Sequence, residues 1–183
     1  MADQPVTNTG GAPQSPSEAV ATPVRDGAVP QIGFLGNAKA KLDERGRLKL
    51  PVEFKAVVDR KYGEGYKDFY ITSLTGEDAD IYPLVEWRQI ELRLQSAPAE
   101  EQEMIDKMYE ADLLFGDQVE MDSQSRLLIP DELRSRGLMN QDVRVAGRNN
   151  KLRVVVLDRL RANVAKRPVE DSDRLILAKY GLR

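Results

Sequence analysis

The ten residues "LDERGRLKLP", numbers 42–51, return in altered form as "MDSQSRLLIP", numbers 121–130. The two copies carry apolar residues at matching places and several identical residues between them. The identical residues include Asp43 and Asp122, Arg47 and Arg126, and Pro51 and Pro130. So much agreement over ten aligned positions indicates a duplicated structural unit. Two short copies are too few for a solenoid of stacked repeats.

Each copy predicts a strand, a tight turn, a second strand and a short helix. In the first copy, "NAKAKL" and "RLKL" alternate basic residues with small or apolar ones, which is typical of half-buried strands. Between them, Asp43 can accept backbone N–H bonds and Gly46 can adopt positive φ, so "DERG" favours a turn. Pro51 fits the first position of a helix. In the second copy Pro130 opens the helix and Gly137 ends it.

The whole chain divides into five segments. Residues 1–31 hold five of the ten prolines and few large apolar residues, so we expect a disordered N-terminal arm. Each copy is followed by a further strand pair, which predicts an α+β fold with a first unit at 32–83 and a second at 115–161. A helical pair at 84–114 separates the units, and a helical tail covers 162–183.

Helical periodicity supports the helical segments. Four apolar residues of the pair predict a stripe that packs in a core or helix–helix seam: Met104, Ile105, Met108 and Leu113. Near the C-terminus, a short amphipathic helix is expected to begin at Ser172 and to end at Gly181.

The composition argues against an enzyme or a membrane protein. The chain has no histidine and no cysteine, which excludes the commonest general base, thiolate metal ligands and disulfides. We expect no metal, no cofactor and no small-molecule substrate. One enzymatic alternative is metal-assisted hydrolysis by carboxylates of the insert, but a solvated helix face is the favoured interpretation of Glu100, Glu101, Glu103 and Asp106. Without an apolar span or a secretory signal, the expected location is the cytoplasm.

The net charge of −3 conceals strong segregation. Residues 36–61 carry eight Lys or Arg against four Asp or Glu, and residues 124–167 carry eleven against four. Residues 76–122 carry three against fourteen. Because binding follows the local field, the two basic segments are compatible with an anionic partner. The alternative is mutual neutralisation of basic strands and acidic helices inside the fold.

The parity of the first strand pair points to double-stranded DNA. If Leu42, Leu48 and Leu50 face inward, four cations share the outer face: Lys39, Lys41, Arg47 and Lys49. Arg45 lies at the turn. A two-stranded ribbon fits the major groove, where Arg and Lys reach phosphates and guanine edges. In the second copy the outward positions hold Gln118, Glu120, Arg126 and Leu128, which suits packing or a subunit surface.

Several motifs together resemble the MraZ family. The stretches "GFLGNAKAKLDERGRLKLPVEF", "IYPLVEW", "MDSQSRLLIPDELR" and "VRVAGRNNKLRV" carry the likeness over residues 33–161. The resemblance implies two tandem swapped-hairpin (AbrB-like) β-barrel units with short helices and a helical pair between them. It also implies a ring-shaped, octamer-like homo-oligomer. Such proteins are nucleoid-associated transcriptional regulators that bind direct DNA repeats upstream of the division and cell-wall gene cluster.

The resemblance also implies roles for individual residues. The implied DNA-binding residues are Lys39, Lys41, Arg45, Arg47, Lys49 and Arg126, and the structural motif residues are Asp43, Gly46, Pro51, Asp122 and Pro130. Pairing with Asp122 or a neighbouring chain is the alternative for Arg126. The chain departs from the family pattern in its N-terminal arm, in Ser125 where glycine is usual, and in "RVVVLDRL", which lacks an aromatic residue. An AbrB-type antitoxin, which binds a toxin and its own operator, is the alternative function.

Overall fold

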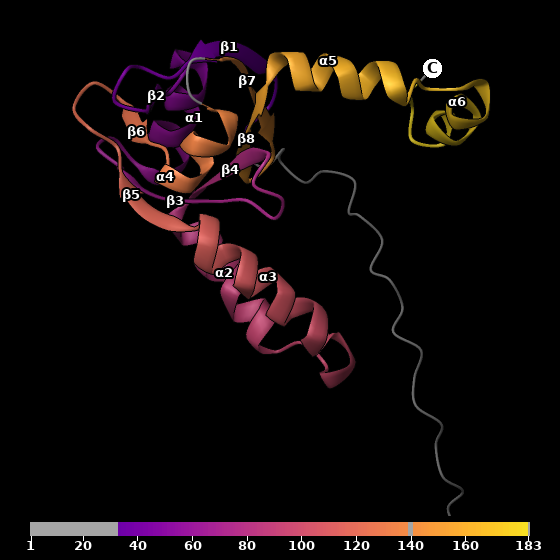
Figure 1. Ribbon diagram of the computed structural model, residues 1–183, viewed down its shortest axis with the longest axis horizontal. Helices are drawn as coiled ribbons and strands as arrows, with labels where there is room; N and C mark the ends of the chain where they lie inside the picture. The colour runs from indigo at the N-terminus through magenta and orange to yellow at the C-terminus, as the bar shows by residue number, and fades with distance from the viewer. Residues whose placement is uncertain (1–32, 139–140, 183) are drawn as a thin grey trace, which may run out of the picture. The chain divides into compact units, whose positions relative to one another are not determined.

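The computed structural model describes residues 33–138 and 141–182, and Figure 1 labels their helices and strands. The arm expected over residues 1–31 lies outside the described residues. The first elements in chain order are β1 (Asn37–Lys41), β2 (Arg47–Lys49), α1 (Val52–Tyr62), β3 (Asp68–Thr72), β4 (Asp78–Pro83), α2 (Leu84–Gln95), the 3-10 helix η1 (Ala99–Glu101) and α3 (Gln102–Phe115). The elements that follow are β5 (Asp117–Glu120), β6 (Arg126–Leu128), α4 (Asp131–Leu133), the π-helical turn η2 (Arg134–Leu138), β7 (Asp142–Arg148), β8 (Lys151–Val156), α5 (Leu157–Lys166) and α6 (Asp171–Ala178).

The strands form one six-stranded antiparallel sheet and one two-stranded antiparallel ribbon. The sheet has the order β1-β7-β8-β4-β3-β5, and β2 pairs with β6 in the ribbon. Together with the helices, this arrangement gives the expected α+β fold. The six-stranded sheet is open, with β1 and β5 at its edges. Because neither sheet closes within the described part of the chain, the expected β-barrels are not confirmed.

Strand pairing interlocks the two copies of the repeat. The pairs β1–β7, β2–β6, β3–β5 and β4–β8 each join a strand of one copy to a strand of the other. The hairpins β3–β4 and β7–β8 pair within a copy. In the sheet, β1, β3 and β4 of the first copy correspond to β5, β7 and β8 of the second. Replacing each strand by its counterpart gives the same strand order, read from the opposite edge of the sheet. The copies therefore form two halves of a pseudo-twofold arrangement.

One sequence-based expectation about this pairing is wrong. The stretches "NAKAKL" and "RLKL" were expected to pair along one ribbon, but a single bridge between Leu42 and Leu48 joins them. Instead, β1 lies in the six-stranded sheet and β2 lies in the ribbon with β6. The alternation in each strand is correct, because Ala38 and Ala40 pack against the core while Lys39 is exposed. The partner strand was not encoded in that alternation.

Backbone hydrogen bonds and one buried side-chain pair hold β2 against β6. The bonds run from Leu50 N to Ser125 O at 2.8 Å and from Ile129 N to Gly46 O at 3.1 Å. At the centre of the ribbon, Leu48 lies opposite Leu127, and both side chains are 0% exposed. Removing two leucines from water favours this pairing by roughly 1.5–3 kcal/mol for each side chain. The ribbon is thus the place where the copies cross.

The short helix of each copy packs into the core beside this crossing. The sequence predicts Pro51 and Pro130 at the first position of a helix; in the structure each lies one residue earlier, at the N-cap of α1 and of α4. Phe54 of α1 and Leu133 of α4 occupy aligned positions and are 1% and 0% exposed. Gly137, at φ 116°, lies in η2 where the sequence predicts the end of the second helix. Both copies therefore cover the core with an equivalent apolar side chain.

The helical pair forms at the expected place and is anchored on β3. Figure 1 shows α2 and α3 extending away from the strands. Trp87 of α2 stacks on Tyr70 of β3, with ring centroids 4.4 Å apart and planes inclined by 12°. From α3, Asp112 accepts hydrogen bonds from the hydroxyls of Tyr70 and Thr72 at 2.8 and 2.6 Å. These contacts fix the base of the pair.

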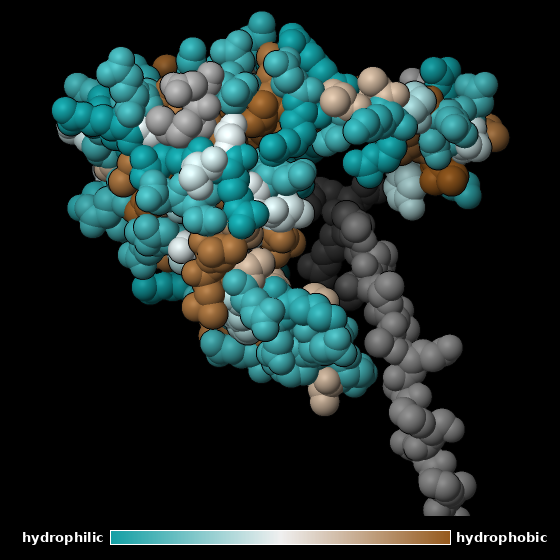
Figure 2. All heavy atoms as spheres, in the orientation of Figure 1, coloured by the Kyte–Doolittle hydropathy of each residue, from teal (hydrophilic) through white to brown (hydrophobic). Residues whose placement is uncertain are grey.

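The apolar stripe expected on the helical pair is wrong for two of its four members. Ile105 is 1% exposed and Met108 is half-buried, but Met104 and Leu113 are 57% and 88% exposed. Consecutive residues lie about 100° apart around a helix, so Met104 and Ile105 point in different directions. Figure 2 shows apolar side chains gathered where the pair meets the strands, with a largely hydrophilic surface beyond.

The C-terminal helices follow directly on β8. The helix expected over 172–181 corresponds to α6, which begins with a capping box formed by Glu170 and Asp173. Gly181 then adopts φ 84°, a conformation that suits the end of a helix. Among the described residues, no helix combines the length and the apolar character needed to cross a membrane.

Candidate nucleic-acid interface

The turn between β1 and β2 is built around the carboxylate of Asp43. Its Oδ1 accepts hydrogen bonds from the backbone N–H groups of Arg45 and Arg47 at 3.0 and 2.9 Å. Its Oδ2 accepts a hydrogen bond from Nε of Arg47 at 2.8 Å. Gly46 adopts φ 77° and donates its N–H to the Asp43 carbonyl at 2.8 Å. Asp43 therefore holds both the backbone of the turn and the side chain of Arg47.

The turn between β5 and β6 repeats this geometry. Asp122 Oδ1 accepts from the backbone N–H groups of Gln124 and Arg126, both at 2.9 Å. Asp122 Oδ2 accepts from Nε of Arg126 at 2.8 Å. Ser125 takes the place of Gly46 with φ 59°, so the turn survives without its glycine. The substitution at Ser125 therefore leaves the turn type unchanged.

The two turns meet through a four-membered ionic cluster, which we call the Asp–Arg quartet: Asp43, Arg47, Asp122 and Arg126. Each arginine is paired with the aspartate of its own turn, at 2.8 Å for Arg47 Nη2 and 2.7 Å for Arg126 Nη2. Each also approaches the aspartate of the other turn, at 3.8 and 3.9 Å. The arginine side chains are each 24% exposed. The quartet thus adds an electrostatic link at the crossing of the copies.

Hydrogen bonding inside the quartet favours the ionised aspartates. The side-chain hydrogen bond from Arg47, reinforced by backbone N–H donors, lowers the pKa of Asp43. At Asp122 desolvation raises the pKa, but the hydrogen bonds from Arg126 and the backbone outweigh it, so the pKa is again lowered. Both carboxylates are therefore charged at neutral pH, and each partly neutralises its arginine.

This geometry corrects the expected position of Arg47. The sequence placed Arg47 on one outer face with Lys39, Lys41 and Lys49, without an acidic partner. In the structure Arg47 is paired within the quartet, and the lysines are divided between β1 in the sheet and β2 in the ribbon. The division follows from the exchange of strands, which separates β1 from β2.

The remaining predicted cations are exposed near the first turn. Within the residues that the structure describes, no ion pair involves the side chains of Lys39, Lys41, Arg45 or Lys49. Lys41, Arg45 and Arg47 line an open recess of about 600 Å³. Lys49 lies directly opposite Arg126 in the ribbon. We call Lys39, Lys41, Arg45 and Lys49 the free cations.

The second copy lacks all four free cations at the equivalent positions. Lys39, Lys41, Arg45 and Lys49 align with Gln118, Glu120, Gln124 and Leu128. The quartet, in contrast, takes one aspartate and one arginine from each copy. Residues that the shared turn needs are therefore present twice, whereas the free cations belong to the first copy alone.

Sequence reasoning missed two further cations beside β1. Arg144 lies directly opposite Lys39 in the β1–β7 register, and Arg148 follows on the same face of β7. The alternation in "VRVAGR" was a signal for this placement, since Val143 and Val145, on either side of Arg144, are buried. What it did not reveal is that β7 lies beside β1. The basic surface thus extends from the first copy onto the second.

The acidic residues of the insert do not converge on a site. Glu100 and Glu101 lie in η1, Glu103 and Asp106 lie on α3, and all four are exposed. In the described part of the chain, no group of three or more acidic, His or Cys side chains is placed to hold a metal ion.

The two turns predict opposite responses to substitution at their positive-φ residues. A Cβ at Gly46 would overlap the side chain of Arg134, and φ would remain unfavourable, so Gly46→Ala should cost about 1–3 kcal/mol of unfolding free energy. Ser125→Gly relieves backbone strain and should gain up to about 1 kcal/mol. Urea unfolding of both variants at one protein concentration measures the difference. If Ser125→Gly lowered the free energy of unfolding as much as Gly46→Ala does, position 125 would not share the positive-φ conformation of Gly46.

Comparison with known proteins gives a consistent result. No protein-family model matches the chain. A transcriptional regulator MraZ of Acidobacterium capsulatum is 37% identical over 152 residues, covering 81% of this chain and 99% of the relative. One from Koribacter versatilis is 32% identical over 149 residues, again covering 81% and 99%. One from Neisseria meningitidis is 25% identical over 142 residues, covering 78% of this chain and 92% of the relative.

The matched segment is long enough to include most of the described chain, and the relatives are covered almost from end to end. The chain belongs to the MraZ family of transcriptional regulators.

Proposed function

We propose that the chain is a sequence-specific DNA-binding regulator that reads duplex DNA with the basic surface of its first copy. The observation that carries this proposal is that the four free cations surround the first turn, whereas none of the equivalent positions of the second copy holds a cation. None of these four side chains forms an ion pair with a described residue, so their charges do not stabilise the fold in that way and are available to a binding partner. Phosphate contacts from such side chains position a protein on DNA, and contacts with base edges specify the sequence.

Arg47 and Arg126 have a different part in this proposal. Their guanidinium groups orient the two turns through Asp43 and Asp122, and the exposed quarter of each side chain remains available to a phosphate. We assign both residues primarily to holding the interface in shape. Loss of either would then weaken DNA binding through the turn.

The proposed target and assembly extend the MraZ resemblance. The target is a set of direct repeats upstream of the division and cell-wall gene cluster, read by several subunits of a ring-shaped, octamer-like homo-oligomer associated with the nucleoid. Exposed apolar side chains on α2 and α3, including Leu92, Met104 and Leu113, support a subunit contact there. The interlocked copies support a tandem swapped-hairpin, AbrB-like arrangement. Several subunits on repeated sites would gain avidity without new contacts.

The test is a salt titration of binding to the DNA upstream of the chain's own gene cluster. Affinity, measured by fluorescence anisotropy, should fall with a log–log slope of about −0.9 for each phosphate neutralised. Four free cations predict a slope of about −3 to −4 for each engaged subunit. A duplex with the repeats scrambled and the base composition kept is the control. Equal affinity for both duplexes, or affinity independent of salt, contradicts the proposal.

A further inference from the structure

A recess of about 290 Å³ lies on the outer face of β7 and β8, against α5. Its polar lining includes Arg144 and Arg148 from β7, Arg153 from β8, and Asn163 and Arg167 from the α5 segment. Four arginines therefore surround a space the size of a small ligand, since ligand pockets usually begin at about 300 Å³.

Strand and helix periodicity bring these side chains together. In β7, alternate residues are buried in the core, so Arg144 and Arg148 share the outer face. On the helical side, Leu160, Asn163 and Arg167 follow one another at intervals of three and four residues, which places them on one face. The recess is therefore a product of regular elements.

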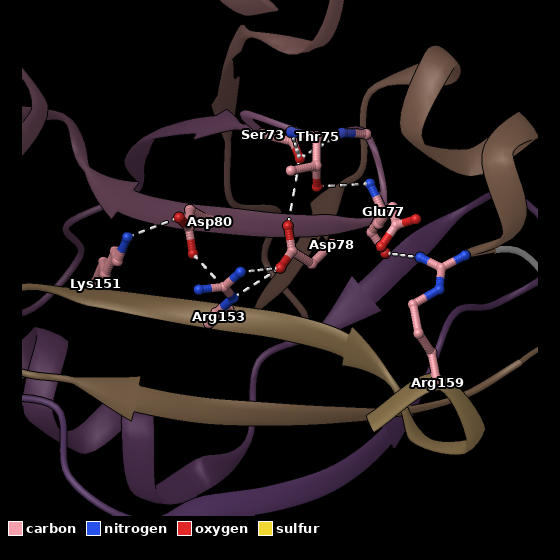
Figure 3. A network of polar contacts seen from close by, with 9 residues as sticks. Ser73, Thr75, Glu77, Asp78, Asp80, Lys151, Arg153 and Arg159 are labelled. Carbon is pink, nitrogen blue, oxygen red and sulfur yellow. Dashed lines mark hydrogen bonds and ion pairs between the residues drawn. The ribbon is translucent and has the colours of Figure 1, made fainter. Parts of the chain in front are cut away.

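One wall of the recess is fixed by the polar network drawn in Figure 3. Arg153 donates from Nε to Oδ2 of Asp78 at 2.8 Å and also pairs with this carboxylate through Nη2. Arg159, near the start of α5, donates to the carbonyl oxygen of Glu77 on the approach to β4. These contacts connect β8 to β4 and α5 to the residue before β4, beside the recess. Arg153 is already neutralised by Asp78.

The other three arginines lack such a partner. Arg144 donates to Oδ1 of Asn37 at 3.0 Å, which is a neutral acceptor. Arg148 and Arg167 have no side-chain hydrogen bond or ion pair with any residue that the structure describes. The carboxylate in the lining belongs to Asp78, which is already paired with Arg153 and so does not neutralise the other arginines. Three uncompensated positive charges around one cavity repel one another, and a bound anion would remove that cost.

We propose that this recess binds a small, multiply charged phosphate compound, of the size of pyrophosphate or a short phosphate ester. Guanidinium groups present planar pairs of N–H donors that match phosphate oxygens. Leu160 and Val155 supply a limited apolar surface for an organic substituent. Duplex DNA is too broad to enter a cavity of this volume between a helix and a sheet. Arg144 also lies opposite Lys39 at the edge of the basic surface, so Arg167, on the α5 side of the recess, is the lining residue that separates this proposal from the DNA-binding function.

The probe is inorganic pyrophosphate, titrated calorimetrically into the full chain in metal-free buffer. Arg144→Gln and Arg167→Gln should each weaken binding about tenfold, since each removes a charge-assisted hydrogen-bond donor. Arg161→Gln is the matched control, because Arg161 is also on α5 but pairs with Asp158 at 2.9 Å and lies outside the lining. The control should bind as the unaltered chain does.

Three outcomes would overturn the proposal. The first is no detectable binding at about 1 mM pyrophosphate, a weak affinity for a specific site. The second is an equal loss in Arg161→Gln, which would show non-specific attraction. The third is loss of pyrophosphate binding in Lys49→Gln with no loss in Arg167→Gln, which would place the anion on the DNA-binding surface. Duplex titration of Arg167→Gln distinguishes the two functions, because its DNA affinity should stay unchanged.

Discussion

Replacing Lys39 and Lys41 together by glutamate will weaken binding to the repeat-containing duplex by about 100-fold or more. Both side chains are exposed on β1 and free of ion pairs within the described residues, so each is available to a phosphate. The change removes two positive charges from every subunit and introduces two negative ones. It should also reduce the salt slope by about two for each engaged subunit. Anisotropy titration at several salt concentrations measures both quantities.

The fold should tolerate this double substitution. Glu at position 39 would face Arg144 across the β1–β7 pair and gain an attraction, whereas Glu at position 41 would face Asp142 and gain a repulsion. Each cross-strand term is about 0.2–1 kcal/mol, so the two largely cancel. Circular dichroism and urea unfolding check that the sheet remains intact.

The matched control is Lys107→Glu combined with Lys179→Glu, which produces the same change of net charge elsewhere. Lys107 lies on α3 and pairs with Glu103 at 2.6 Å, and Lys179 is exposed after α6. This control should retain most of the DNA affinity. If both double variants lose affinity equally, net charge governs binding and the basic surface of the first copy does not.

Leu48→Ala and Leu127→Ala will each lower the free energy of unfolding by about 2–5 kcal/mol. These side chains face each other at the centre of the ribbon and are 0% exposed, so each truncation leaves a cavity where the copies cross. Because they are in contact, the double variant should show a coupling of about 0.5–3 kcal/mol. Urea unfolding at one fixed protein concentration gives the four values of the cycle.

Leu128→Ala is the control for this cycle. Leu128 follows Leu127 in the same strand but is 46% exposed, so its truncation should change the unfolding free energy by less than about 0.5 kcal/mol. A large effect at Leu128 would indicate that a subunit contact covers it. Additive effects of Leu48→Ala and Leu127→Ala would show that β2 and β6 are not coupled in solution.

The elements of this fold were predictable because their signals are local. Pro51 and Pro130 mark helix starts through their own geometry, and the Asp43 turn depends on hydrogen bonds within five residues. The alternation of Lys39 and Lys41 with alanines also identified the exposed face correctly.

The partners of these elements were not predictable in the same way. Strand alternation states which side chains face outward, but it does not state which strand lies alongside. For that reason the sequence paired β1 with β2, and it left Arg47 unpaired when Asp43 was four residues away. Arg144 was overlooked as a neighbour of Lys39 because the two are 105 positions apart in the chain.

The exchange of strands also constrains how the chain is made. During synthesis β1 and β2 leave the ribosome long before β6 and β7, their partners in the finished fold. Contacts between such distant segments form slowly, because a long loop must close before any pairing is gained. Until β6 and β7 are synthesised, the edges of β1 and β2 remain unpaired, and unpaired strand edges are vulnerable to aggregation and proteolysis. A nascent chain arrested after α3 holds Lys39, Lys41 and Lys49 but lacks β7 and β6, the partner strands of β1 and β2.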